Sequence, residues 1–277
     1  MIFDHCSFSW GRDETFSINS DKKGPLGGIT IQNTIFGQGL LPHSAGGLIQ
    51  ASHVTLFRNL YVDNSTRNNK VKGINQYANN IDYNWENGCY IMGDSKGVSN
   101  CNIVGNLFIM GPNGGGKVFS RGNDRFFFFG QDNWLDADRN GLFNPKCLDG
   151  LGSGGGSTVA QRFDYPRLPL IPALDLPEKL LPTVGASKPR RDPVDVLLVE
   201  QVRSFGKAGS LIDDESSLDC GSPGSWRFQF AKAPNDTDRD GMPDAWESAH
   251  GTNPKKDDAT RTAANGYLNI ENYLNSL

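Results

Sequence analysis

The sequence predicts an all-β fold, a single-chain parallel β-helix solenoid followed by a small tail with an acidic loop and a short helix. Three observations predict it. Short β-branched and aromatic runs recur through the first half of the chain, each run contains an asparagine, and no helical pattern lies between them. The runs are ITIQNTIF (29–36), VTLFRNLYV (54–62), YANNIDYNW (77–85) and CNIVGNLFI (101–109).

The inner asparagines of these runs recur at a period typical of one solenoid coil. Asn33, Asn59, Asn80 and Asn106 are spaced 26, 21 and 26 residues apart. Leucine-rich repeats have a similar period, but their leucine pattern is missing here. Asparagine tolerates left-handed backbone geometry at a bend, and its amide can bond to the coils on either side. We therefore expect the four asparagines to stack.

The remaining chain divides by composition. The strand-like pattern continues in RFFFFGQDNWLD (125–136), so we expect the coils mainly within residues 1–150. Glycine-rich 151–163 predicts a flexible surface stretch, proline-rich 166–193 an extended segment along the solenoid wall, and 194–206 a helix. An acidic composition starts near Pro234, and LNIENYLNSL at the end predicts a short helix. The predicted domains are a solenoid at 1–233, including a wall-packing segment at 151–233, and a tail at 234–277.

Composition also narrows the classes of function. A formal net charge of −4 over 277 residues argues against a protein that follows nucleic-acid phosphates. No apolar run is long enough to cross a membrane, and we expect a monomer. The five cysteines include no CxxC pair, which excludes a recognisable zinc or thioredoxin motif. Cys6 and Cys101 lie in strand-like text and are expected to be small buried apolar side chains.

The N-terminal end already has the pattern of a strand. Met1 leads directly into IFDHCSFSW, without the basic and apolar regions of a signal peptide. A solenoid needs a capping element over its first coil. We therefore expect an N-terminally shortened chain that lacks its first coils.

An acidic loop near the C-terminus fits a calcium template along its whole length. In DTDRDGMPDAWE (236–247) the carboxylates stand at positions 1, 3, 5, 9 and 12 of the template and a glycine at position 6, and they are Asp236, Asp238, Asp240, Asp244 and Glu247. So many carboxylates repel one another unless a cation neutralises them. The loop therefore predicts bound Ca²⁺, in a distorted loop because Pro243 interrupts it. The segment TAANGYLNIENYL would be the second loop of a calcium-binding pair. Of the template residues it retains only Asn265 and Gly266, and we expect it to bind no ion.

A second loop, DADRNG (136–141), opens in the same way with Asp136, Asp138 and Asn140. Position 12 of its template would be Cys147, so the bidentate closing ligand is missing. Two interpretations remain open, a weak calcium site or a polar turn between coils.

Five segments of the first half form a family signature. They are DHCSFSWGRDE (4–14), HSAGGLI (43–49), NLYVDNSTRNNKVKG (59–73), YANNIDYNW (77–85) and GNLFIMGP (105–112). Their order and spacing resemble polysaccharide lyase family 1, the pectate lyases, over roughly residues 1–150. The resemblance implies a right-handed parallel β-helix and calcium-assisted β-elimination of (1,4)-linked polygalacturonate. The tail is similar to the DxDxDG tails of secreted bacterial polysaccharide-degrading enzymes, which implies an extracellular protein.

The same residues suit an acidic polysaccharide on chemical grounds. Polygalacturonate carries one carboxylate per sugar, so its site needs bound metal or basic side chains. Asp4, Asp13 and Glu14 offer hard oxygen ligands for the metal. The basic side chains are those of Arg67, Lys70 and Lys72, and residues two apart on an extended segment point to the same side.

The resemblance implies a role for each of these positions. Asp4 and Asp13 match calcium-ligand aspartates, with Glu14 as a further candidate. Arg67 opens a segment similar to the RxPxxR motif of the family and matches the arginine that removes the C5 proton. Lys72 stands where the second arginine of that motif binds substrate.

Departures from the family pattern keep other functions open. Asn69 replaces the proline of RxPxxR, Lys72 replaces an arginine, and Ser17 stands where many members have a third aspartate. The lysine of the HDK-like segment of the family is absent, with His43 nearby. One alternative is a non-catalytic carbohydrate-binding or adhesin-like β-helix. Another is a β-helix lyase that acts on a different uronate polymer.

Overall fold

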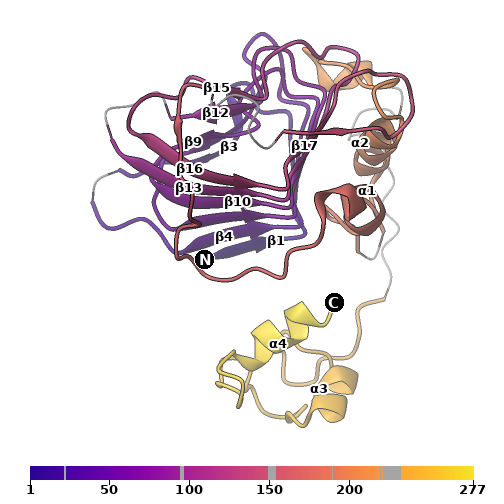
Figure 1. Ribbon diagram of the computed structural model, residues 1–277. Coiled ribbons are helices and arrows are strands. Elements are labelled where there is room, and N and C mark those ends of the chain that lie inside the picture. The colour runs from indigo at the N-terminus through magenta and orange to yellow at the C-terminus, as the bar shows by residue number, and fades with distance from the viewer. Residues whose placement is uncertain (22, 94–96, 149–153, 189, 219, 221–231) are drawn as a thin grey trace. The chain divides into compact units, whose positions relative to one another are not determined.

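The computed structural model describes the chain except residues 22, 94–96, 149–153, 189, 219 and 221–231. The chain divides into two compact units, Met1–Pro223 and Gly224–Leu277 (Figure 1). The boundary predicted between residues 233 and 234 lies inside the second unit. Residues 151–153, the start of the predicted flexible stretch, lie outside the described residues.

Parallel strands of the first unit stack into three sheets, A, B and C, to which successive coils contribute in turn. Sheet A consists of β1 (Ile2–Asp4), β4 (Ile29–Gln32), β7 (Val54–Phe57), β10 (Ile74–Ala78), β13 (Ser99–Val104), β16 (Phe126–Gln131) and β19 (Ser157–Thr158). Sheet B consists of β2 (Ser7–Ser9), β5 (Ile35–Gly37), β8 (Leu60–Val62), β11 (Ile81–Tyr83), β14 (Leu107–Ile109), β17 (Trp134–Asp136) and the antiparallel β18 (Lys146–Cys147). Sheet C consists of β3 (Glu14–Ile18), β6 (Ala45–Ile49), β9 (Lys70–Val71), β12 (Tyr90–Met92) and β15 (Phe119–Ser120).

This arrangement is a parallel β-solenoid of about six turns, and it confirms the predicted fold class (Figure 1). Inward side chains from successive coils pack on one another and form the core. Phe36, for example, stacks between Phe8 and Tyr61, with ring centroids 5.6 and 4.8 Å apart. Part of the stretch predicted to be flexible instead forms β19, because its backbone pairs with β16 at the edge of sheet A.

An asparagine ladder runs along the bend between sheets A and B. The backbone amide of Asn59 donates to Asn80 Oδ1, and that of Asn80 to Asn106 Oδ1, each at 2.9 Å. Asn133 continues the ladder in the next coil, and Thr34 N donates to Asn59 Oδ1 at 3.0 Å in the preceding one. The predicted stacking is confirmed for three of the four asparagines, and the sequence argument missed Asn133.

The position of Asn33 was predicted wrongly. Asn33 lies one residue before the ladder and has a φ of 48°, which is the left-handed position that Arg58 and Asn79 take in the next two coils. Left-handed geometry and stacking therefore belong to two consecutive residues of the bend, and the sequence argument had assigned both to one residue.

The proline-rich segment lies along the outer face of sheet A. The backbone of Phe163 exchanges two hydrogen bonds of 3.0 Å with the side chain of Asn102, and Gln76 Nε2 donates to Pro166 O at 3.1 Å. Ile171 N donates to Asn79 Oδ1 at 2.9 Å. Because Asn102 lies one coil after Gln76 and Asn79, the segment runs back toward the N-terminal coils.

A helix packs on the outside of sheet B. It is α2 (Pro193–Arg203), which overlaps the helix predicted at 194–206. The side chain of Asp192 caps it by accepting hydrogen bonds from two first-turn amides, at 2.8 and 2.9 Å. Leu198 lies so close to Gly37 that a Cβ there would be 2.6 Å from Leu198 Cδ1. Other described helical elements of this unit are η1 (Ala173–Asp175), α1 (Leu176–Lys179) and η2 (Glu215–Ser217).

The second unit contains α3 (Asp244–His250) and α4 (Asn269–Asn275), the latter inside the predicted terminal helix. Trp246 joins the two helices, because its Nε1 donates to Ser276 Oγ at 2.9 Å and its ring packs on Tyr273. Within the described part of the chain, no helix has the length and apolar character needed to cross a bilayer. Cys6, Cys89, Cys101 and Cys147 form no disulfide in the described part of the chain. Of the two expected to be buried, Cys101 is buried and Cys6 half-buried.

Candidate functional site

The first site lies at the bend that leads into sheet C, where three successive coils meet. Glu14 opens β3 and pairs in register with Ala45, which opens β6. Ala45 in turn forms a parallel bridge with Thr66, the residue before Arg67. This register brings Asp13 and Glu14 of the first coil, His43 of the second and Arg67 of the third side by side.

Each carboxylate of this group has a basic side chain beside it. Arg67 Nη1 forms an ion pair with Glu14 Oε1 and lies 3.9 Å from Asp13 Oδ1. His43 Nδ1 lies 2.6 Å from the same Asp13 oxygen. The Glu14 side chain is 8% exposed and that of Asp13 is 71% exposed, so the pair spans the boundary between interior and solvent. The structure therefore brings together three predicted site residues, and it adds His43.

The backbone at Arg67 has a constrained conformation. Its φ of 53° lies in the left-handed region, which is costly for a residue with a side chain. Gly47 N donates to Arg67 O at 2.6 Å, and a Cβ on Gly47 would lie 2.3 Å from Asn69 Oδ1. Gly46 is equally confined, since its Cβ would lie 2.8 Å from Asn68 Oδ1. The two glycines thus allow residues 67–69 to pack closely on the preceding coil.

The predicted substrate-binding lysines follow in the same coil. Lys70 lies on β9 and Lys72 directly after it, while Val71 between them is fully buried. Both lysines therefore point outward from sheet C, as their spacing predicts. Lys72 Nζ donates to Gln50 Oε1 at 3.3 Å, and both lysine side chains are half-exposed.

Asp4 lies apart from the other acids. It ends β1 on sheet A, whereas Glu14 begins β3 on sheet C. Its carboxylate accepts hydrogen bonds from Gln32 Nε2 at 2.8 Å and Asn33 Nδ2 at 2.9 Å, and it lies 2.8 Å from His5 Nδ1. The structure does not bring Asp4 into one cluster with Asp13 and Glu14.

Asp13 and Glu14 can together hold a divalent cation. One oxygen of each carboxylate lies beside the same guanidinium nitrogen, Arg67 Nη1. Calcium takes six to eight oxygens, so water and a substrate carboxylate would have to complete the shell. The residues fit calcium as part of a site that is shared with substrate.

The second site is the acidic loop of the tail. Two groups of three carboxylates, with ligand atoms within 4.8 Å of one another, occur in the described chain. Their members are Asp236, Asp238 and Asp240 in one group, and Asp240, Glu247 and Asp258 in the other. The two groups share Asp240, so they form one continuous cluster.

Glu247 is the decisive member of this cluster. Its side chain is fully buried and neither carboxylate oxygen has a hydrogen-bond partner. Burial, and then the charges of Asp238 and Asp240, raise the pKa of Glu247 to about 7. A buried carboxylate without a partner is costly, and a cation bound among these oxygens would remove that cost. The residues fit a calcium ion.

The structure groups the acids of the loop differently from the spacing template. Asp244, predicted at position 9, lies outside both groups and accepts hydrogen bonds from Thr237 N and Oγ1 at 2.7 and 2.8 Å. Asp258 joins the cluster, although it lies eleven residues beyond Glu247. The spacing template ends at Glu247 and could not have found it.

The weak candidate loop after β17 satisfies its own polar groups. Asp138 Oδ2 accepts from Asn140 Nδ2 at 2.8 Å and from Asn144 Nδ2 at 2.7 Å. Asp136 is buried, which raises its pKa, and it accepts from Asn144 N at 3.3 Å. The geometry favours the polar-turn interpretation, and we assign no metal to Asp136, Asp138 and Asn140.

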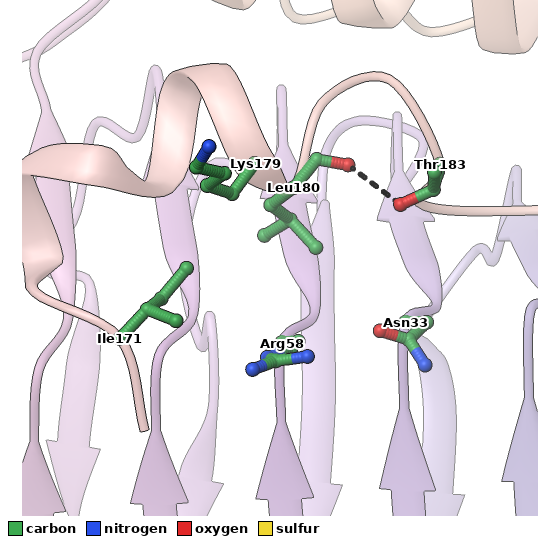
Figure 2. A pocket seen from close by; sticks show the side chains of 6 residues that line it. All are labelled: Asn33, Arg58, Ile171, Lys179, Leu180 and Thr183. Atoms are coloured by element: carbon green, nitrogen blue, oxygen red, sulfur yellow. Dashed lines mark hydrogen bonds between the residues drawn. The ribbon is translucent and has the colours of Figure 1, made fainter. Parts of the chain in front are cut away.

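A shallow pocket lies elsewhere, between the solenoid and its wall segment. Figure 2 shows that it is lined by Asn33, Arg58, Ile171, Lys179, Leu180 and Thr183. Arg58 Nη2 donates to Pro169 O at 2.6 Å, and burial lowers the pKa of this guanidinium. The pocket is a seam of the wall segment and includes none of the predicted site residues.

The relatives found by comparison with known proteins share one name. A protein of Aspergillus flavus named "Probable pectate lyase C" is 46% identical over 285 residues, covering 100% of this chain and 65% of the relative. Proteins of the same name from Aspergillus terreus and Emericella nidulans are 47% and 45% identical over 283 residues and again cover the whole chain. The chain is similar to fungal proteins named as pectate lyases. No family model matches it.

The alignments extend through the tail as well as the solenoid, because they cover the whole chain. The tail, predicted from its likeness to bacterial enzymes, is therefore aligned with these fungal relatives too. The chain spans just under two thirds of the length of the relatives. A solved structure entitled "Structure of the thermostable pectate lyase PL 47" is 13% identical with a TM-score of 0.38, over 64% of this chain and 53% of the other, and is too distant to add to this.

Proposed function

We propose that this protein is a polysaccharide lyase that cleaves (1,4)-linked polygalacturonate by calcium-assisted β-elimination. The observation that carries the proposal is the convergence of Arg67 with Glu14 and Asp13 across three coils, beside two outward lysines. These are the residues to which the pectate lyase resemblance assigns chemistry. The names of the relatives support the same activity.

The reaction requires a base, a way to neutralise the uronate carboxylate, and a means of holding the polymer. In its deprotonated form, the guanidine of Arg67 accepts the C5 proton. The electron pair of the C5–H bond becomes the C4–C5 double bond, and the C4–O bond breaks with its electron pair on the departing oxygen. Lys70 and Lys72, which lie in the same coil as Arg67, bind the carboxylates of neighbouring sugars.

Calcium bound with Asp13 and Glu14 would neutralise the uronate carboxylate and make the C5 proton more acidic. Glu14 now pairs with Arg67, so this pairing must loosen before Arg67 can act. Polygalacturonate and abundant calcium occur outside cells, and we therefore place the activity there.

For the tail we propose a stabilising calcium ion held by Asp236, Asp238, Asp240, Glu247 and Asp258. The fully buried Glu247 with two unpartnered oxygens supports this site. A ligand that binds only the folded state stabilises it by mass action. The expected role is stability of the second unit.

The test is the formation of unsaturated uronate, followed by the ultraviolet absorbance of its conjugated double bond. We expect absorbance to rise with polygalacturonate and calcium, and to stop when a chelator is added. Polymannuronate and highly methylated pectin are the comparison substrates. Cleavage of polymannuronate alone would indicate a lyase for another uronate. Binding of polygalacturonate without any double bond would indicate a non-catalytic binding protein and contradict the proposal.

A further inference from the structure

A buried acid and a buried phenol meet inside the solenoid, one coil beyond Arg67. Asp82 lies on β11 and Tyr77 on β10, and both side chains are fully buried. Tyr77 Oη lies 2.9 Å from Asp82 Oδ1, 2.8 Å from Asp82 Oδ2 and 3.0 Å from the backbone oxygen of Asn68. Asn68 directly follows Arg67. The phenol thus joins the buried acid to the segment that carries the proposed base.

The phenol has one hydrogen for three acceptor oxygens. If Asp82 is ionised, the hydrogen goes to the carboxylate, and the Asn68 oxygen faces only the lone pairs of the phenol. If Asp82 is protonated, its own hydroxyl donates to Tyr77 Oη, and the phenol hydrogen is released to the Asn68 oxygen. The arrangement with a proton on Asp82 gives a partner to the carboxyl hydrogen, the phenol hydrogen and the Asn68 backbone oxygen.

The surroundings of Asp82 favour the protonated form. Burial raises its pKa well above the usual range of a carboxyl group. The titratable groups that face it are Tyr77 of β10, Tyr61 of β8, Tyr90 of β12 and Cys89, and the pKa of each is itself raised by burial. Hydrogen bonds from Tyr77 and Cys89 act in the opposite direction on the pKa of Asp82, but burial is the larger effect. These groups are neutral at neutral pH, so none supplies a positive charge that would favour ionised Asp82.

The backbone at Asn68 is held from several sides. Its N–H donates to Cys89 O at 2.9 Å, and its Oδ1 accepts from Asn64 Nδ2 at 3.0 Å. Tyr77 adds the bond to its backbone oxygen. Because Arg67 has a left-handed φ, these bonds to its neighbour oppose relaxation of the bend.

We propose that Asp82 and Tyr77 are positioning residues for Arg67: the proton on Asp82 keeps Tyr77 bonded to the Asn68 oxygen and thereby fixes the direction of the Arg67 guanidinium. The proposal rests on the proposed lyase function. Loss of the proton at high pH frees the Asn68 oxygen, loosens the bend and lowers turnover. The fold thus carries an upper pH limit for the activity in a residue that does not touch substrate.

Three variants of the full chain test this proposal. Tyr77→Phe removes the hydrogen bond to Asn68, and Asp82→Asn keeps a permanent donor toward Tyr77. Tyr90→Phe is the control, because it removes the hydroxyl of another buried tyrosine in the same coil, one that interacts with Cys101. We expect Tyr77→Phe to lower kcat about 10-fold with KM within about 2-fold, because small misplacements of a catalytic group are costly. Tyr90→Phe should keep kcat within about 2-fold.

The pH profile separates positioning from mere packing. Asp82→Asn should match the natural protein at neutral pH and keep its activity at high pH, where the natural protein loses activity. A high-pH limb that is identical in the two proteins would overturn the proposal, as would normal kcat in Tyr77→Phe.

Two spectroscopic measurements do not depend on turnover. Infrared spectra should show the carbonyl stretch of a protonated carboxyl group that is absent in Asp82→Asn, and absence of this difference overturns the proposal. The ¹⁵N-labelled guanidinium resonance of Arg67 should move in Tyr77→Phe and stay in place in Tyr90→Phe. If the natural protein shows no lyase activity but both signals behave as expected, the proposed function fails while the positioning stands.

Discussion

Two acidic sites in this protein are built in opposite ways. In the solenoid, Asp13 and Glu14 lie beside the basic side chains of Arg67 and His43. In the tail, Glu247 lies among aspartates, and no residue that the structure describes forms a hydrogen bond with either of its oxygens. The acid count is therefore a poor guide to what each site does.

The difference indicates when each site needs calcium. The tail holds a buried carboxyl group without a described hydrogen-bond partner, so calcium should contribute mainly to folding of the tail. In the solenoid site each carboxylate already has a basic side chain beside it, so calcium should contribute there mainly to substrate binding and turnover.

Removing Glu14 should affect turnover far more than stability. Glu14→Ala leaves Arg67 with only the more distant carboxylate of Asp13, at 3.9 Å, and removes one of the two proposed calcium ligands. We expect kcat/KM on polygalacturonate to fall by about 10³-fold, in the range for loss of a group that positions a catalytic residue. Calcium-dependent melting of the tail should be unchanged. A tail transition that shifts in this variant would break the separation of the two sites.

Removing the buried acid of the tail should do the reverse. Glu247→Gln should abolish most of the stabilisation that calcium gives to the second unit, about 3 kcal/mol at calcium one hundred times above its Kd. Turnover should stay within about 2-fold. Calorimetry of the full chain with calcium and with chelator measures the first quantity.

The matched control is Asp244→Asn. The spacing template makes Asp244 a ligand, whereas the structure pairs it with Thr237. We expect calcium stabilisation to survive in Asp244→Asn and to be lost in Asp258→Asn. The opposite pattern would show that the loop follows its template and that Asp258 is not a ligand.

Asp63 tests whether a buried carboxylate that has no compensating cation destabilises the fold when it ionises. Burial raises its pKa from 3.8 to about 7. The folded state therefore binds more protons than the unfolded state between these values, and stability falls as pH rises through that window. Asp63→Asn cannot ionise and should raise the free energy of unfolding at pH 8 by about 1–3 kcal/mol. The gain should vanish near pH 4, and urea unfolding at both pH values measures it.

The smallest effect concerns Lys72. Lys72→Arg restores a planar fork that binds carboxylates through two parallel hydrogen bonds. We expect KM for polygalacturonate to fall about 2- to 5-fold with little change in kcat. An unchanged or raised KM would indicate that Lys72, which contacts Gln50, is not part of the substrate groove.

Much of the fold was readable from the sequence because a solenoid repeats its signals. Strand runs recur in successive coils, and a ladder asparagine recurs from the third coil onward, so Asn59, Asn80 and Asn106 could be aligned without a structure. Asn33 could not be placed correctly, because neighbouring residues of the bend have different roles and Thr34 takes the ladder position there. The local sequence does not show which of two adjacent residues adopts the left-handed backbone conformation at the bend.

The sites were less readable because their members come from different coils or elements. Glu14 and Arg67 are 53 residues apart, and only the register of sheet C shows that they meet. Asp4 shares a motif with Asp13 yet ends up on another sheet. Asp258 and Asp82 had no signal in spacing, since one lies beyond the loop template and the other is recognised only by burial and its contact with Tyr77.

The most direct test of the central claim is the rate of double-bond formation by Arg67→Ala, measured by ultraviolet absorbance at saturating calcium and polygalacturonate. The matched control is Arg203→Ala, an exposed arginine of α2 that pairs with Glu200. The account predicts that Arg67→Ala loses at least about 10³-fold in kcat while it remains folded and still binds the polymer, and that the control is unchanged. Turnover by Arg67→Ala within about 10-fold of the natural protein would contradict the assignment of Arg67 as the base.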